Sequence, residues 1–295
     1  MVLWFFNSLI LFAMKKIFPT CCLILLPFLV HAEYLIYGKV TDQQDRPIPF
    51  VNVGFVGTSI GTVSSMEGEF RLYFVEMPNL SIPLRISSMG FEPIEVMLTE
   101  ESIGELMHFQ LKENLIQLQE AVVKSGALHT KTYGNEDEKT AIKTNLAIST
   151  QPGMNLGSEI GRKFRLGDGP NYVSSLKFFV AFNNFDSLMI RVNFYELESG
   201  KPTNVLNTKP ILRLVANHKN GWVTFDLEDE NLVLSGTIVA SIEWVGASKR
   251  GNAFGLNISM PAVFQTHYYK YGAQNSWKVF PNMSSSMVLV VERED

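Results

Sequence analysis

The chain has 295 residues, of which 46% are hydrophobic and 18% are charged, and its formal net charge is −4. This composition can build a sizeable core, and it excludes a solvated, disordered chain. The mild acidity gives no basic face, so nucleic acid is not an expected partner. The 21 Phe and nine Tyr residues favour β-structure, and the length favours two domains.

The N-terminus has the pattern of an export signal. Lys15-Lys16 precedes an apolar run, which ends in Val30-His31-Ala32 with small residues at the positions that a signal peptidase reads. We expect a signal peptide over residues 1–32, with translation starting at Met14. The apolar segments on either side of the lysines are each shorter than the roughly 17–25 residues of a spanning helix, which disfavours a membrane anchor.

Both cysteines, Cys21 and Cys22, lie in this apolar run. Phe18, Pro19 and Thr20 do not fit the residues that precede a lipoprotein cysteine, so lipidation is disfavoured. The mature chain would then have no disulfide, no thiol nucleophile and no Cys-based metal site. It would also have no transmembrane segment, and we expect an exported product in the periplasm, at the outer-membrane periphery or on the cell surface.

Residues 33–125 alternate short apolar runs with turn residues, which is typical of a β-sandwich. Val51, Val53 and Phe55 alternate with small or polar residues, so that one face of the strand points into the core. The expected strands are 34–41, 50–55, 61–64, 69–74, 84–88, 94–98, 107–111 and 119–123.

Residues 126–144 show no apolar periodicity and predict a linker. The strand pattern returns over residues 145–295 and predicts a second antiparallel, jelly-roll-like sandwich, so the fold class is all-β. The alternating sets are Leu176/Phe178/Val180/Phe182, Leu188/Ile190/Val192/Phe194, Val223/Phe225/Leu227 and Ile238/Ala240/Ile242/Trp244, with 287–291 as the last strand and turns that include Asn220-Gly221 and Ser235-Gly236.

Several short motifs follow one another through the first unit: Arg46-Pro47-Ile48-Pro49-Phe50, Gly57-Thr58-Ser59-Ile60-Gly61-Thr62, Glu67-Gly68-Glu69-Phe70, Ser88-Met89-Gly90-Phe91 and Leu118-Gln119-Glu120-Ala121-Val122-Val123. With these motifs the unit resembles the carboxypeptidase regulatory-like family, a transthyretin-like β-sandwich common in exported proteins of Bacteroidetes type. Asp45-Arg46 and Ser65 depart from the family pattern in turns. The resemblance implies a non-catalytic module.

In that family the module often precedes the plug and barrel of an outer-membrane receptor. Twenty-two strands of about ten residues would need well over 200 residues, and 170 residues follow Ser125. We therefore expect a short exported form with a C-terminal β-sandwich and no receptor barrel.

Catalytic motifs do not assemble in the sequence. His108, His129, His218 and His267 do not begin a zinc-protease spacing, so no metal site is predicted from them. Gly57-Thr58-Ser59-Ile60-Gly61 matches a nucleophile elbow formally, but an elbow needs a following helix, and a strand is expected here.

An acidic group, Asp226, Glu228, Asp229 and Glu230, could hold Ca²⁺ through oxygen ligands, but EF-hand spacing is absent. A solvated acidic turn is the preferred interpretation, and no cofactor is expected.

The candidate ligand platform consists of Tyr268, Tyr269, Tyr271, Asn275 and Trp277. Flat aromatic rings can stack on sugar faces while amides bond the hydroxyls. The rival interpretation is aromatic packing or partner contact.

We expect a non-catalytic exported cell-envelope protein that acts as a binding module, through protein–protein or surface contact with an envelope protein or a surface glycan. The first alternative is a carbohydrate-binding module that uses the exposed aromatics of the second sandwich. The second alternative is a hydrolase whose site assembles only in three dimensions.

Overall fold

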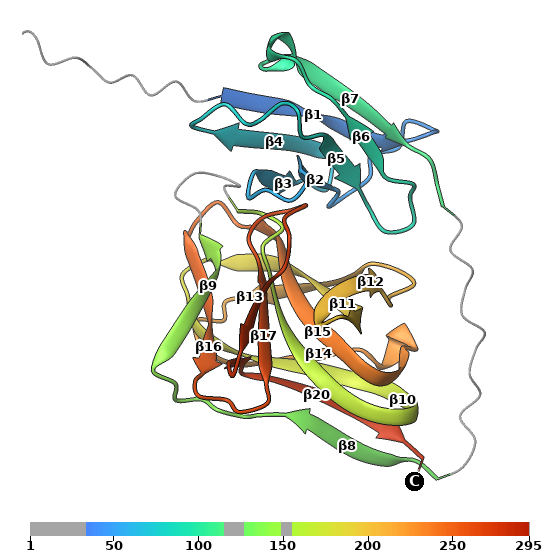
Figure 1. Ribbon diagram of the computed structural model, residues 1–295, viewed down its shortest axis with the longest axis vertical. Coiled ribbons are helices and arrows are strands. Elements are labelled where there is room, and N and C mark those ends of the chain that lie inside the picture. Colours follow the sequence, from blue (N-terminus) through green and yellow to red (C-terminus); the bar gives the residue numbers. More distant parts are fainter. Residues whose placement is uncertain (1–33, 115–126, 149–154, 295) are drawn as a thin grey trace, which may run out of the picture. The chain divides into compact units, whose positions relative to one another are not determined.

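The computed structural model describes residues 34–114, 127–148 and 155–294 (Figure 1). Regular structure in these ranges is β-strand apart from two short 3-10 helices, η1 (Glu100–Ser102) and η2 (Glu228–Glu230), which confirms the all-β prediction. Neither of these helices is long or apolar enough to cross a bilayer. The expected signal peptide, the cysteine pair and the strand at 119–123 lie outside the described residues.

Strands β1–β7 form two sheets, which we call the N-terminal sandwich. In one sheet β1 lies between β4, to which it is antiparallel, and β7, to which it is parallel. The other sheet is antiparallel, with the order β3–β2–β5–β6. The strands are β1 (Tyr34–Asp42), β2 (Asn52–Phe55), β3 (Gly61–Val63), β4 (Glu69–Phe74), β5 (Leu84–Ser87), β6 (Ile94–Val96) and β7 (Leu106–Leu111).

The core of the N-terminal sandwich follows the predicted alternation. Phe70 and Leu72 of β4 are 2% and 3% exposed, while Arg71 between them is exposed. They pack in one cluster with Phe55 and Ile86 from the other sheet. One face of each sheet therefore meets the other across an apolar interior.

Strands β8–β20 form one connected antiparallel sheet of thirteen strands, which we call the C-terminal sandwich. The strands are β8 (His129–Gly134), β9 (Ile142–Ile148), β10 (Glu159–Asn183), β11 (Ser187–Glu198), β12 (Lys201–Val205), β13 (Ile211–Ala216), β14 (Gly221–Asp226), β15 (Val233–Ala247), β16 (Ala253–Ser259), β17 (Thr266–Lys270), β18 (Lys278–Pro281), β19 (Ser284–Ser285) and β20 (Met287–Arg293).

The 25-residue strand β10 holds this sheet together, and Figure 1 shows its long curve. It pairs with β14, β15, β16, β17 and β20, and shifts of register along it let it bend. At one shift Gly167 lies opposite Gly236. Ser235-Gly236, which the sequence predicts as a turn, therefore lies within β15, at a bend of the sheet.

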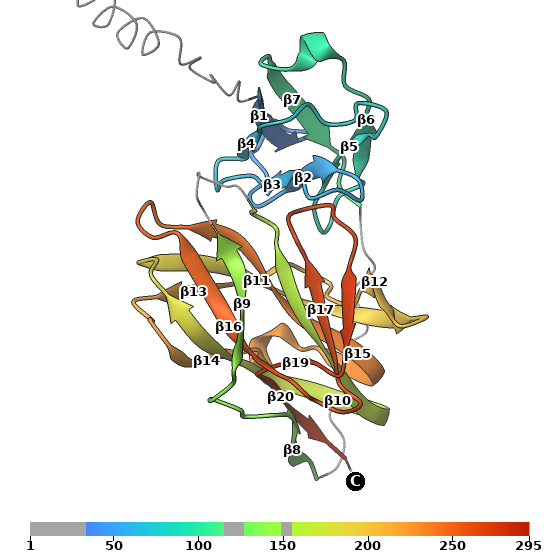
Figure 2. The ribbon, with the colours of Figure 1, turned by 60° about the vertical axis from the view of Figure 1, so that its left-hand side comes forward.

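The structure also differs from the sequence prediction at residues 126–144, where a linker was expected. β8 lies inside it and pairs with β20, and β9 begins inside it and pairs with β16, which Figures 1 and 2 both show. β8 is an edge strand with mostly exposed side chains, so it lacks the apolar alternation of a half-buried strand. Its Thr130 and Thr132 are β-branched, and Tyr133 packs against the core.

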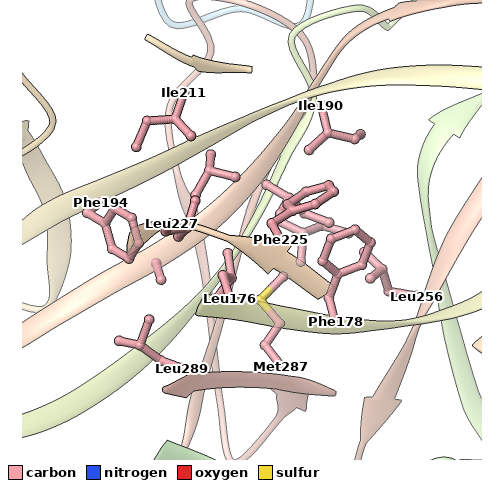
Figure 3. Close-up of a cluster of buried hydrophobic side chains, with 14 of the residues drawn as sticks. Leu176, Phe178, Ile190, Phe194, Ile211, Phe225, Leu227, Leu256, Met287 and Leu289 are labelled. Carbon is pink, nitrogen blue, oxygen red and sulfur yellow. The ribbon is translucent and has the colours of Figure 1, made fainter. Parts of the chain in front are cut away.

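The core of the C-terminal sandwich contains the predicted alternating sets. Side chains from several strands converge in Figure 3, among them Phe178 of β10 and Phe225 of β14. Their ring centroids lie 5.2 Å apart in an edge-to-face arrangement. Phe182 departs from the pattern and is only partly buried, because the register of β10 against β16 shifts between Val180 and Phe182.

Replacing Phe178, which is fully buried, by Ala should lower the free energy of unfolding by about 3–5 kcal/mol, because the cavity cannot close. Phe179→Ala is the matched control, since Phe179 points to the other face and packs edge-to-face on Trp222. It should cost about 1 kcal/mol. Urea denaturation followed by tryptophan fluorescence measures both, and equal losses would contradict this assignment of the core face.

Candidate functional site

The predicted aromatic platform is divided between two faces of the sheet. Tyr268 is 1% exposed and packs with Tyr195 and Val239. Tyr269, the next residue of β17, packs against the main core on the opposite face. Successive side chains of a strand point in opposite directions, so Tyr268 and Tyr269 cannot share a flat surface.

The other three platform residues follow β17. Asn275 donates a hydrogen bond from Nδ2 to the Tyr271 carbonyl oxygen at 2.8 Å, so this amide is used within the turn. The Trp277 ring meets Tyr195 and Tyr268 edge-on, with centroids 5.5 and 6.4 Å away. Tyr271, Asn275 and Trp277 keep part of their surface exposed. Tyr269 is also partly exposed, and its ring centroid lies 6.3 Å from that of Tyr271. Sugar binding stays a prediction.

Beside Tyr268 lies a set of charged residues that sequence reasoning missed. We call Glu159, Arg191, Glu243 and Lys270 the buried ionic cluster. Arg191 Nε lies 2.8 Å from Glu243 Oε2, and its Nη2 lies 3.0 Å from Glu243 Oε1, a bidentate pair. Lys270 Nζ lies 2.5 Å from Glu159 Oε2. The four residues come from the neighbouring strands β10, β11, β15 and β17, and their charges balance.

Neutral side chains complete the hydrogen bonding of the two carboxylates. Asn193 Nδ2 lies 2.9 Å from Glu159 Oε1 and 3.0 Å from Glu243 Oε2. The Tyr195 hydroxyl donates to Glu159 at 2.9 Å, and the Ser241 hydroxyl donates to the same carboxylate. Every carboxylate oxygen therefore accepts at least one hydrogen bond or ion pair, as burial of a charge requires.

The protonation states follow from this pairing. Burial alone would raise the pKa of Glu243, but Arg191 and then Lys270 outweigh burial and bring that pKa down to about 2. Burial, followed by the charge of Glu159, raises the pKa of Tyr195 well above its ordinary value. The carboxylate of Glu243 is therefore ionised and the phenol of Tyr195 is neutral at physiological pH.

The buried ionic cluster also contacts the N-terminal sandwich. Arg191 Nη1 donates to the Phe50 carbonyl oxygen at 2.8 Å, and Nη2 donates to Asn52 Oδ1 at 2.8 Å. Nearby, Gln274 Nε2 donates to Ser87 Oγ at 2.7 Å. A Cβ on Gly61 would lie 2.2 Å from the Ala273 carbonyl oxygen, so this position requires glycine. The guanidinium of Arg191 thus bonds to residues of both sandwiches.

A second polar group lies where β17 pairs with β10. Arg162 and His267 face each other in register and are each 3% exposed. Burial lowers the pKa of His267 to about 4, so its imidazole is neutral at physiological pH. Burial also lowers the pKa of Arg162 to about 10, although the charge of Asp137 partly offsets it.

The remaining sequence candidates do not form a site. In the described residues, no three His, Asp or Glu side chains gather to hold a metal. Glu230 is paired with Lys209 at 3.0 Å and Arg213 at 2.8 Å, which leaves its carboxylate engaged in the acidic turn. Ser59 lies in the turn between β2 and β3, where a strand follows rather than a helix.

Breaking the Arg191–Glu243 pair should be costly. Arg191→Met or Glu243→Gln alone leaves a buried charge without its partner and should lower the free energy of unfolding by about 3–5 kcal/mol. The double variant R191M/E243Q should cost less than the sum of the two single variants, because the remaining Glu159 and Lys270 still balance. The control is Lys209→Met. The Lys209 side chain is 59% exposed, so its ion pair should contribute less than about 1 kcal/mol. Additive losses in urea titrations would contradict the pairing.

The depressed pKa of His267 predicts a pH dependence. An unfolded histidine binds its proton below about 6.5, whereas the folded one does so below about 4, so stability is full above the higher value and falls as pH drops through this window. Between about pH 7 and about pH 5 the loss should be about 2 kcal/mol. His267→Gln should remove most of this slope in thermal melts, and an unchanged slope would show that another group titrates. The stability that Glu243 contributes is lost at lower pH, as the pH falls from about 4.5 to about 2.

The comparisons with solved structures give distant likenesses. The cysteine protease and lectin-like domains of Cwp84, a surface layer associated protein of Clostridium difficile, match at 9% identity with a TM-score of 0.40, over 88% of this chain and 63% of that chain. A streptococcal ancillary pilin matches at 11% identity with a TM-score of 0.21, over 84% of this chain and 58% of that chain. A variant of BcpA, the major pilin subunit of Bacillus cereus, matches at 10% identity with a TM-score of 0.20, over 88% of this chain and 69% of that chain.

The chain thus spans less than two thirds of the first two structures, and likenesses this low indicate no function. A search of curated proteins found no match. The CarboxypepD_reg-like domain model matches residues 36–123. This match confirms the resemblance carried by the sequence motifs: residues 36–123 of this chain are a carboxypeptidase regulatory-like domain.

Proposed function

We propose that this chain is a non-catalytic, exported cell-envelope protein that binds a protein partner through an apolar surface of its C-terminal sandwich. Rigid sandwiches commonly present loops for binding. The export pattern at residues 1–32 supports the location. The buried ionic cluster supports a structural rather than a catalytic use of charge, because every oxygen of its two carboxylates already accepts a hydrogen bond or an ion pair.

The observation that carries this proposal is an exposed apolar loop. Met260, Val263 and Phe264 are 61%, 62% and 76% exposed, and Phe280 on the adjacent β18 is 36% exposed. We call these four residues the apolar loop tip. Large apolar side chains that gather at one place on a surface are typical of interaction sites.

The backbone of this loop is held in place. Ala262 N donates to the Asn282 carbonyl oxygen at 2.8 Å, Asn282 N donates to the Gln265 carbonyl oxygen at 3.0 Å, and Gln265 N donates to the Ala262 carbonyl oxygen at 3.1 Å. Phe264 has φ of 62°, a left-handed conformation that is costly for a bulky residue. The loop therefore presents its most exposed aromatic ring at the expense of backbone strain, which favours a binding role.

Carbohydrate binding is the second candidate function. It is favoured by the partial exposure of Tyr271, Asn275 and Trp277. The Lys270 ammonium lies 5.1 Å from the centre of the Trp277 ring, so Lys270 already occupies one face of that indole. This arrangement makes a sugar-stacking role for Trp277 weaker than the apolar loop tip as a binding surface.

Phe264→Ser should weaken binding of the purified protein to envelope fractions of its own organism at least tenfold, because the exposed ring would supply contact area in the complex. Leu106→Ser is the matched control, since Leu106 is 74% exposed on the N-terminal sandwich. Bound protein is measured by sedimentation with envelope over a concentration series, and thermal melts show whether each variant is folded. Equal binding by both variants would contradict the proposal.

A further inference from the structure

A cavity of about 190 Å³ opens at the edge of β10. Its lining consists of Tyr133, Gly134, Arg162, Lys163, Phe164, Arg165 and Gln265, and we call it the Arg162 pocket. On this edge β10 pairs with β17 as far as Arg162 and with β20 from Asn171 onward. The pocket therefore occupies the interval between two neighbouring strands, where side chains from both faces of β10 meet.

The charge of the lining has one sign. Arg162, Lys163 and Arg165 contribute three cations, and no lining residue is acidic. The nearest acid that acts on Arg162 is Asp137. Its carboxylate already accepts hydrogen bonds from Asn135 Nδ2 and Ser259 Oγ, each at 2.6 Å. Arg162 Nη1 donates to Asn135 Oδ1 and to the Ser285 and Met287 carbonyl oxygens, but none of these acceptors is charged. The charge of the guanidinium is thus only partly compensated, and a bound anion would supply the rest.

Unsatisfied polar atoms gather around the same guanidinium. Among the described residues, four buried side-chain atoms lack a hydrogen-bond partner, and three of them are Arg162 Nε, His267 Nδ1 and Ser285 Oγ. His267 lies opposite Arg162 in the sheet, and the Ser285 carbonyl oxygen accepts from Arg162 Nη1 at 2.9 Å. Buried polar groups are normally bonded, so the unbonded Nε of Arg162, which lines the pocket, favours a bound group there, while His267 and Ser285 lie behind the lining residues.

The other lining residues set the size and character of the ligand. The volume is below that of a pocket for a drug-sized molecule. Tyr133 and Phe164 offer ring surface, and Gln265 offers an amide that can bond a hydroxyl. We propose that the Arg162 pocket binds the carboxylate or phosphate group of an anionic ligand no larger than a monosaccharide.

The test titrates the ¹⁵N-labelled protein with glucuronate, with inorganic phosphate and with neutral glucose, and follows the Arg162 Nε–H signal. Glucuronate or phosphate should shift this signal and saturate it, and glucose should bind at least tenfold more weakly. Saturation by glucuronate alone would identify a sugar acid, and saturation by phosphate would identify a phosphate group. The absence of saturation by either anion would overturn the proposal.

The variants separate the pocket from nonspecific attraction. Arg162→Met removes the central cation, but it also removes bonds to Asn135 Oδ1 and to the Ser285 and Met287 carbonyl oxygens, so its fold must be checked. The double variant K163Q/R165Q keeps those bonds and should weaken anion binding about tenfold. Arg250→Gln, in an exposed loop, is the control and should leave affinity unchanged. If K163Q/R165Q and the unaltered protein bound the anions with equal affinity, the proposal would be overturned. This result would not depend on whether the apolar loop tip binds a partner.

Discussion

Two carboxylates and two cations lie together inside the C-terminal sandwich, and the arrangement of the molecule depends on their balance. Glu159 and Glu243 face away from the main apolar core, on a surface of the sheet that would otherwise be wet. Because that surface is covered, each charge needs a partner of opposite sign and correct geometry. The covering elements are therefore held in one position: β17 through Lys270, and the N-terminal sandwich through Arg191.

This constraint gives a physical reason for some of the family motif glycines. Gly57 has φ of 73°, and its N–H donates to the Gln274 carbonyl oxygen at 2.9 Å. Gly61 lets the backbone at Ala273 approach the β2–β3 hairpin. A motif that the sequence explains as a tight turn is thus also a contact surface. The carboxypeptidase regulatory-like domain contributes backbone groups, such as the Phe50 carbonyl oxygen, and the side chains of Asn52 and Ser87 to the contact.

The alternation of apolar residues predicted both cores but not the polar clusters. In β11 the sets Ile190/Val192/Phe194 and Arg191/Asn193/Tyr195 alternate, and the apolar pattern predicted the burial of the first set only. The available signal was in β15, where Val239, Glu243 and Val245 share a face and are all buried. A strand that is apolar on both faces is covered on both faces, so Glu243 had to be paired. The sequence could not show which partners would reach it.

The length of β10 has a consequence for how the chain folds. Glu159 pairs with Lys270, and Asn171 pairs with Arg293 at the end of the last strand. Contacts between residues so far apart in sequence form slowly, because the long chain segment between them must first be brought together at an entropic cost. The sheet cannot close until β20 has been synthesised. The C-terminal sandwich of the nascent chain therefore stays open for longer than a fold built from local contacts would.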